Sequence, residues 1–410
     1  MTLAESPGGA DMKNGPAVLG GTPASEDLIP VSSPTLRAYE DLAGGFRDIV
    51  TSGMITTAKY VAEFEREVAA YLGVGEAVAV SSNTTGLLLL LKSLRLRGDV
   101  ILPSFTFSVS GHVLTWNNLR PVFVDIDAET CLMDPAAVEK AITPATCAIL
   151  GVHIWGNPCP ADRLQEIADR RRVVLLFDSA QGMGSQYGGR RVGGFGRAEV
   201  FSCSPTKLLT CGEGGVVTTN DPELARLVRF GRNYGNDGSY DCLYEGLNAR
   251  MSEFHGWLGL TSLRMLDENL EQRRRLVKHY MGRLESLPGI RFQRITPGGE
   301  SNWVYFSILV DPDAFGLTAD ELMAAMKAEN IQTRRYYSPP LHRQRVYVDS
   351  ARLYEGRLPN TERVASRALT LPLFSHMTTA QVDAVCLAVE RIHDRRGAVR
   401  EALARPAVTA

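Results

Sequence analysis

The sequence predicts an α/β protein with a mostly parallel central sheet covered by helices, followed by a smaller C-terminal α+β region. Short apolar segments alternate with amphipathic helical patterns through residues 61–219. One segment, at 173–177, reads Val-Val-Leu-Leu-Phe, which is typical of a strand buried on both faces. A chain of 410 residues favours two or three domains. We expect a flexible tail at 1–30, a large domain at 31–275 and a small domain at 276–410.

The large domain contains the alternating elements. A helix is expected at 61–72, where Val61, Phe64 and Val68 share one face and Gly73 ends the pattern. The remaining elements expected here are helices at 86–94 and 161–170, and strands at 77–80, 100–102, 121–125, 147–154, 173–177, 199–202 and 216–219. Ligands of such sheets bind at the carboxyl ends of strands. Phe107, Asp178 and Lys207 follow strand ends and are therefore candidate site residues.

After residue 252 the pattern changes. A long helical stretch is expected at 252–287, a strand at 303–310, a helix at 318–329 and a final helix from Thr379. Between them lies a polar aromatic loop with Tyr336, Tyr337 and His342, which either reaches a substrate or packs. Runs of this kind indicate a small α+β domain.

The composition excludes several classes of protein. The chain has 44 Lys and Arg against 46 Asp and Glu, and no basic run interleaved with aromatics, so we expect no nucleic-acid partner. Its apolar runs are too short to span a membrane. Seven cysteines without paired spacing indicate reduced thiols in a cytoplasmic protein and no metal site.

Lys207 stands between an apolar strand and a glycine-rich turn at 212–215. Burial disfavours the charged form of a lysine, and a neutral amine can attack an aldehyde and hold it as an imine. This pattern indicates pyridoxal phosphate (PLP) as the cofactor. A lone lysine is more often a solvated surface residue, so the prediction depends on the residues around it.

Three neighbouring segments meet the other needs of PLP. Asp178 ends a buried strand and needs a partner, which a protonated pyridine nitrogen would supply; helix capping is the alternative. The Ser-Asn-Thr-Thr-Gly segment at 82–86 opens an apolar helix and offers phosphate donors, although simple capping would also explain it. Ser202 adds a hydroxyl. Phe107 either stacks on the ring or belongs to the core.

In this order the segments resemble the DegT/StrS family of sugar aminotransferases, which are fold-type-I PLP enzymes. The likeness runs from about residue 29 to 390. It is carried by the segments 53–56, 63–65, 81–86, 102–107, 121–127, 177–181, 201–215, 246–252 and 371–373.

The resemblance implies the roles of the site residues. Lys207 matches the imine-forming lysine and Asp178 matches the partner of the pyridine nitrogen, so these two are the expected catalytic residues. The further cofactor contacts that it implies are the phosphate ligands Thr84, Thr85 and Ser202, the stacking ring Phe107, the ring-hydroxyl contact Gln181, and Asn248. The last would reach the phosphate of the neighbouring subunit's cofactor, which implies a homodimer with shared active sites.

The implied reaction moves an amino group from L-glutamate to a keto sugar on a nucleotide carrier, in deoxyamino-sugar or antibiotic biosynthesis. A dTDP-4-keto-6-deoxyhexose aminated at C4 is the first expectation. A 3-keto sugar nucleotide or an inosose is the enzymatic alternative, and a PLP-binding regulator without turnover is the alternative of another class. Residues 57–59 and 203–205 depart from commoner family patterns and bear on the substrate. A dehydrating branch has His at the lysine position, so Lys207 argues against it.

Overall fold

The computed structural model describes residues 15–405 and contains a seven-stranded sheet. Its strand order is β1-β9-β8-β5-β4-β2-β3. The bounds are β1 Glu76–Val80, β2 Asp99–Pro103, β3 Arg120–Val124, β4 Thr146–Val152, β5 Val174–Asp178, β8 Ala198–Ser202 and β9 Gly215–Thr219. Strands β8, β5, β4, β2 and β3 are parallel, and β9 runs antiparallel to both β8 and β1. The expected mostly parallel sheet is confirmed.

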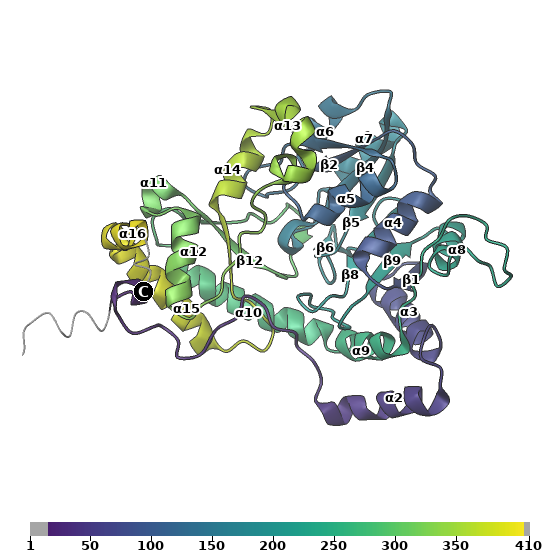
Figure 1. Ribbon diagram of the computed structural model, residues 1–410, viewed down its shortest axis with the longest axis horizontal. Helices are drawn as coiled ribbons and strands as arrows, with labels where there is room; N and C mark the ends of the chain where they lie inside the picture. The colour runs from purple at the N-terminus through teal and green to yellow at the C-terminus, as the bar shows by residue number, and fades with distance from the viewer. Residues whose placement is uncertain (1–14, 406–410) are drawn as a thin grey trace, which may run out of the picture.

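Helices cover both faces of this sheet (Figure 1). Successive strand residues point to opposite sides, so that Leu175 and Phe177 belong to one core and Leu176 to the other. The first core is closed by α3 Lys59–Leu72, α7 Ala161–Arg171 and α9 Glu253–Leu263, and the second by α4 Asn83–Ser93, α5 Ser108–Trp116 and α8 Pro222–Gly231. Helix α6 Pro135–Ala141 adds Val138 to the first core.

The C-terminal part is a three-stranded antiparallel sheet with its own helices. The sheet consists of β10 Ile290–Phe292, β12 Phe306–Val310 and β13 Ala368–Leu371. It packs with α12 Ala319–Ala328, α15 Thr379–Asp394 and α16 Arg396–Ala404. Figure 1 shows α10 Leu266–Leu284 crossing between this part and the large sheet.

Three expected elements differ from the structure. The helix expected at 86–94 is α4, which starts at Asn83 because the cap formed by Ser82 and Thr85 sets its first turn. The helix expected at 252–287 is divided, because α9 ends at Leu263 and α10 starts at Leu266. The Met265 amide bonds the Ser262 carbonyl in a tight turn, and no Gly or Pro marks the break. The strand expected from residue 303 starts only at Phe306, because Trp303 has a left-handed backbone (φ 51°) and Asn302 caps the Val304 amide.

The remaining elements are short or peripheral. Helix α2 Tyr39–Ser52 lies at the foot of Figure 1 and contacts α9, where Trp257 Nε1 donates to the Leu42 carbonyl at 2.9 Å. The others are β6 Gln186–Tyr187, β7 Arg190–Arg191, β11 Gly299–Glu300, α11 Pro312–Phe315, α13 Val348–Ala351, α14 Pro359–Arg367 and the 3-10 helices η1 Ala17–Leu19, η2 Ile154–Gly156, η3 Leu341–Arg343, η4 Arg345–Tyr347 and η5 Arg352–Tyr354.

The expected flexible tail at 1–30 falls partly outside the described residues, which begin at 15. The described part, 15–30, is packed rather than loose. The amides of Ala17 and Ala24 each donate to the buried Glu329 carboxylate at 2.9 Å, and Ile29 forms a parallel bridge with Ile331. In Figure 1 this purple segment passes beside α12 before it reaches α2. Residues 15–30 are held mainly by backbone hydrogen bonds, which produce no apolar periodicity in the sequence, so the pattern did not indicate an ordered segment.

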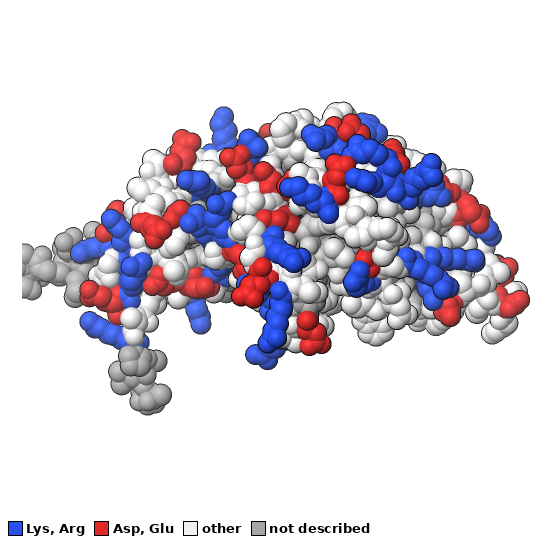
Figure 2. Space-filling model, turned by 90° about the horizontal axis from the view of Figure 1, so that it is seen from above, with Lys and Arg blue, Asp and Glu red and all other residues white. Residues whose placement is uncertain are grey.

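The domain boundary near 275 stays a prediction. It falls within α10, whose residues Leu266 and Leu270 join the core of the large sheet, whereas Leu276 and Tyr280 join the C-terminal core. Figure 2 shows basic and acidic side chains interspersed across one face of the molecule. Within residues 15–405, none of the helices combines the length and apolar character needed to cross a bilayer.

Candidate active site

A cavity of about 340 Å³ opens at the carboxyl ends of β5 and β8. Four larger clefts, of about 710, 1120, 610 and 380 Å³, lie elsewhere and are lined by none of the predicted site residues. The smaller cavity is lined by Ser82, Asn83, Thr84, Thr106, Phe107, Val109, Asp178, Ala180, Gln181, Ser202, Ser204, Thr206, Lys207, Glu213, Gly214, Tyr305, Tyr336 and Tyr337. It therefore brings together the predicted residues, except Thr85 and Asn248.

Asp178 ends β5 as a buried carboxylate whose hydrogen-bond donors are neutral. Ser110 Oγ donates to Oδ2 at 2.7 Å, while Asn83 Nδ2 and the Ala180 amide donate to Oδ1, each at 3.2 Å. Burial raises the pKa of Asp178 above its ordinary value of 3.8, although these bonds and the charge of Lys207 oppose the shift. A cation with a proton to donate would stabilise the charged form of this buried carboxylate.

Lys207 is half-buried in the loop after β8, and its Nζ donates to the hydroxyl of Tyr305 at 2.9 Å. The amine also lies 5.1 Å from the centre of the Tyr305 ring. Tyr305 directly precedes β12, so a residue from the C-terminal part contacts the predicted catalytic amine.

The N-terminus of α4 borders the same cavity. Ser82 and Thr85 form a reciprocal cap, in which each hydroxyl accepts the other residue's backbone N–H at 3.1 Å. Thr84 lines the cavity, whereas Thr85 does not, and the Thr85 hydroxyl belongs to the cap. Ser202 Oγ lies 3.3 Å from Ser204 Oγ on the facing strand end. Hydroxyls and backbone N–H groups at a helix N-terminus suit a phosphate group.

Gly215 allows β9 to approach this helix end. A Cβ atom at Gly215 would lie 2.5 Å from the Ser82 carbonyl carbon and 2.6 Å from the Asn83 nitrogen. These are backbone atoms that cannot rotate away. The glycine after the lysine loop is therefore required by the packing of β9 against the start of α4.

Aromatic side chains form the opposite wall of the cavity. Gln181 Nε2 donates to the Tyr337 hydroxyl at 2.8 Å, and its Oε1 accepts the Trp155 amide at 2.8 Å. Phe107 is 55% exposed, with its ring centre 6.2 Å from that of Tyr337. Phe107 and Tyr337 therefore offer aromatic surface on the wall of the cavity that Asp178 also lines.

Three further residues lie away from the cavity. Asn248 is exposed on a loop, where it forms a bridge with Asn233. Arg250 donates to the Asn233 side chain. His342 is fully buried and bonds Ser104 Oγ at 2.7 Å and Glu362 Oε1 at 2.8 Å, so its role is in packing.

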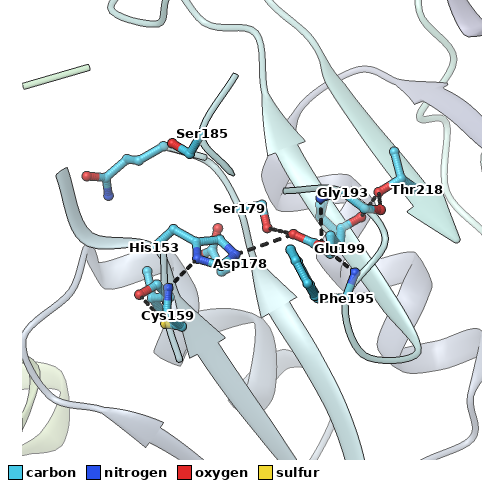
Figure 3. A network of polar contacts seen from close by, with 12 residues as sticks. His153, Cys159, Asp178, Ser179, Ser185, Gly193, Phe195, Glu199 and Thr218 are labelled. Carbon is cyan, nitrogen blue, oxygen red and sulfur yellow. Dashed lines mark hydrogen bonds and ion pairs between the residues drawn. The ribbon is translucent and has the colours of Figure 1, made fainter. Parts of the chain in front are cut away.

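A buried polar network supports the strand ends behind Asp178 (Figure 3). Glu199 accepts the amides of Gly193 and Phe195 at 2.7 and 2.8 Å, and the Ser179 hydroxyl also donates to it. His153 Nε2 lies 3.4 Å from Glu199 Oε2, and its Nδ1 accepts the Cys159 amide at 2.9 Å. Because Nδ1 is an acceptor, the ring proton belongs on Nε2, facing Glu199. The network fixes the residue next to Asp178.

The sequence patterns do not mark Asn83, Ser110 and Tyr305 as contacts of the two predicted catalytic residues. Asn83 lies within the segment assigned to phosphate, and its side chain turns to Asp178 instead. Ser110 follows the predicted stacking ring by three residues. Tyr305 lies 98 residues from Lys207, and no local pattern marks it.

Comparison with known proteins identifies the family. The model of the DegT/DnrJ/EryC1/StrS aminotransferase family matches residues 38–390. The chain belongs to this family. It is accordingly an aminotransferase, and its cofactor is PLP.

Two curated relatives are similar over most of their length. One is dTDP-3-amino-3,4,6-trideoxy-alpha-D-glucose transaminase of Streptomyces venezuelae, 36% identical over 364 residues, which cover 87% of this chain and 94% of the relative. The other is the erythromycin biosynthesis sensory transduction protein EryC1 of Saccharopolyspora erythraea, 35% identical over 361 residues, which cover 87% and 97%.

Solved structures share the fold of this family member. DesI, crystallised in the presence of its TDP-sugar product, superposes with a TM-score of 0.87 at 36% identity, covering 94% of this chain and 98% of DesI. A Streptococcus pneumoniae protein described as a sugar aminotransferase, solved in its PLP form, gives a TM-score of 0.82 at 26% identity, covering 90% and 99%. The α/β aminotransferase fold expected from the sequence is confirmed.

The cavity of this aminotransferase fits PLP. The buried Asp178 carboxylate has only neutral donors and would accept the proton of a pyridine nitrogen. Thr84, Ser202 and the first turn of α4 offer donors for the phosphate, and Lys207 offers the amine for the aldehyde. The three groups belong to one cavity, as a single bound molecule requires.

Proposed function

We propose that the protein transfers an amino group from L-glutamate to a keto sugar carried on a nucleotide. The proposal depends on one observation above all, namely that the Lys207 amine and the Asp178 carboxylate line the same cavity beside the N-terminus of α4. The names of the S. venezuelae relative and of DesI, with their dTDP- and TDP-linked sugars, support a nucleotide-linked sugar as the acceptor.

The acceptor expected from the sequence is a dTDP-4-keto-6-deoxyhexose, aminated at C4. A 3-keto sugar nucleotide is the second candidate, because the S. venezuelae relative is named for a 3-amino sugar. The two candidates share the dTDP carrier and differ in the ring carbon that must face Lys207. The isomer that reacts is the one whose keto carbon is held close to the Lys207 amine.

The residues of the cavity divide the work of the reaction. When bound, PLP supplies a ring that withdraws electrons from the carbon next to the amino nitrogen. Lys207 would remove a proton from the α-carbon of glutamate and would later give a proton to the aminated sugar carbon. Asp178 would keep the proton on the pyridine nitrogen, and Gln181 would orient the ring hydroxyl. Tyr336 and Tyr337 would exclude water above the reacting amine.

Asn248 supports a homodimer with shared sites. Its side chain is exposed and lies outside the cavity of its own subunit, so a contact with a cofactor would have to be made in a second copy. A mixed dimer tests this. Co-expression of Lys207→Ala with Asn248→Ala chains should restore activity that neither homodimer has, because one site of the mixed dimer is then intact. Failure to restore any activity would contradict shared sites.

The substrate is tested with a panel of dTDP-4-keto and dTDP-3-keto deoxyhexoses and an inosose, each with glutamate or glutamine, scored for amino product by mass. The proposal expects one dTDP-keto sugar to gain an amine in the wild type and none in Lys207→Ala. If the protein binds PLP but aminates no member of the panel, the result would favour the alternative of a PLP-binding regulator. The name of the EryC1 relative, a sensory transduction protein, agrees with that alternative. Amination by Lys207→Ala at the wild-type rate would refute the role of the lysine.

A further inference from the structure

The free amine of Lys207 has a phenol as its hydrogen-bond partner. Its Nζ donates to the Tyr305 hydroxyl at 2.9 Å, and Thr206 Oγ1 lies 3.2 Å from the same hydroxyl. Tyr305 is buried, and its ring is held against Tyr336, with 5.0 Å between ring centres. Within residues 15–405, no carboxylate forms an ion pair with Lys207. The ammonium form of this lysine therefore lacks an adjacent carboxylate as counter-ion.

A second cation lies behind Tyr305. The Arg273 guanidinium of α10 is 2% exposed and donates to the carbonyls of Trp303 and Val304, the two residues before Tyr305, at 3.1 and 3.0 Å. Its remaining bonds are to the Leu373 carbonyl and to Ser375 Oγ. No carboxylate of the described residues pairs with it, and burial lowers the pKa of Arg273 to about 10. A buried, uncompensated positive charge favours a negative charge nearby.

These surroundings act on the Tyr305 phenol. Burial alone would raise its pKa, but the charge and hydrogen bond of Lys207, the Thr206 hydroxyl and the Arg273 charge outweigh burial, so the pKa of Tyr305 falls below 10.0. The two tyrosines beside it behave differently, because burial raises the pKa of Tyr336 and of Tyr337. Two carboxylates also line the cavity, Asp178 and Glu213, and the charge of Lys207 acts to lower the pKa of Asp178. Tyr305 is the phenol of this cluster suited to ionise.

We propose that Tyr305 is a catalytic residue that serves as counter-ion and proton acceptor of the Lys207 amine whenever that amine is free of the cofactor. In the step, an N–H bond of the Lys207 ammonium breaks and an O–H bond forms on the Tyr305 phenolate. The products are a neutral amine and a neutral phenol, and no electrons are exchanged. The pair has zero net charge before and after the step, so no other group has to gain or lose a proton.

The reaction needs both forms of the lysine. The amine must be neutral to attack an aldehyde or to take a proton from carbon, and it must be protonated to return that proton. A partner 2.9 Å away that exchanges one proton would interconvert the two forms without exposing the cavity to water. This role goes beyond the transfer reaction proposed above and rests on the lysine assigned there.

The test reads the phenol itself. Holoenzyme reconstituted with pyridoxamine phosphate keeps Lys207 as a free amine, and ionisation of tyrosine is followed by ultraviolet difference absorbance against pH. We expect one tyrosine of the wild type to ionise below pH 10, and that step to vanish in Tyr305→Phe but to persist in the matched control Tyr336→Phe. In Lys207→Met the same step should move up by about one pH unit or more, because the opposite charge is gone.

Two outcomes would overturn the proposal, namely a low step that persists in Tyr305→Phe, or a midpoint that does not move in Lys207→Met. If Tyr305→Phe does not fold, the comparison of wild type with Lys207→Met still decides. The measurement needs no sugar substrate. Its failure is therefore distinguishable from a failure of the proposed transfer reaction, which the sugar panel reads separately.

Discussion

The side-chain amide of Asn83 joins the first turn of α4 to the carboxylate of Asp178, with Nδ2 3.2 Å from Oδ1. The same nitrogen donates to the Val200 carbonyl at 2.9 Å, on the neighbouring strand β8. One side chain thus fixes the distance between the helix end that suits a phosphate and the carboxylate that suits a pyridine nitrogen. The two ends of the cofactor site are held as one unit.

Replacement of Asn83 by alanine should weaken PLP binding. A hydrogen bond to a charged group contributes about 1.5–3 kcal/mol, so we expect the affinity to fall about tenfold or more. The measurement is a titration of apoprotein followed by cofactor absorbance. Asn117→Ala is the matched control, because Asn117 also bonds a backbone carbonyl but lies outside the cavity. Equal affinities for Asn83→Ala and wild type would contradict the bridging role.

Gly215→Ala should push β9 away from the start of α4. Its Cβ would meet backbone atoms at 2.5 Å, and overpacking of this kind costs about 1–3 kcal/mol. We expect a lower urea midpoint together with weaker PLP binding. Gly44→Ala in α2 is the control, since a Cβ there meets nothing within 4 Å and alanine favours the helix. An unchanged midpoint in Gly215→Ala would show that the strand can shift freely.

The Asp178 carboxylate should make the stability of the apoprotein depend on pH. Because burial raises its pKa above 3.8, the folded protein binds this proton more tightly than the unfolded chain. The free energy of unfolding should therefore fall as the pH rises from 3.8 through the raised folded value. Asp178→Asn removes the ionisation, so the melting temperature of the variant should rise relative to that of the wild type as the pH rises from 3.8 through the raised folded pKa of Asp178.

Bound PLP should reverse the order of the two melting temperatures. With cofactor bound, the wild type gains the pyridinium pair that Asp178→Asn lacks, so the wild type should melt at the higher temperature. A pH-independent difference between the two apoproteins would contradict the buried, ionisable state of Asp178.

Glu199→Ala should be strongly destabilising. It leaves the Gly193 and Phe195 amides without their acceptor and His153 without its partner, and loss of one member of a buried pair costs about 3–5 kcal/mol. Glu199→Gln keeps one carbonyl oxygen and should lose less. Urea unfolding measures both, with the exposed Glu223→Ala of α8 as a control that should leave the midpoint unchanged. A small loss in Glu199→Ala would mean that water replaces the carboxylate.

The central sheet was predictable because its strands are apolar on both faces. Each strand of β1, β2, β3, β4, β5, β8 and β9 was expected within about two residues of its bounds. Helix α2 was not predicted, because only Leu42, Gly45 and Ile49 are buried along it and its apolar stripe is narrow. The break between α9 and α10 was also hidden, since residues around Arg264 are good helix formers.

The candidate site divides in the same way. Lys207 and Asp178 follow strand ends, a local pattern that the sequence carries directly. Tyr305 and Asn83 act through contacts with residues far away in the chain, and those contacts exist only once the sheet and the C-terminal part have packed. The cofactor roles of all eight predicted residues stay predictions. Thr85 and Asn248 differ from the other six in that neither lines the cavity of this subunit.

The hydrogen bonds from Ala17 and Ala24 to Glu329 attach residues 17–24 to the C-terminal part of the structure. Arg391 of α15 is held by the same carboxylate, with Nε 3.1 Å from Oε1. Trimming the chain beyond Ala24 would remove two N–H donors from a shielded acid and loosen α12 and α15 together. Shortened versions of this protein should therefore melt earlier at their C-terminal end while the PLP cavity keeps its shape.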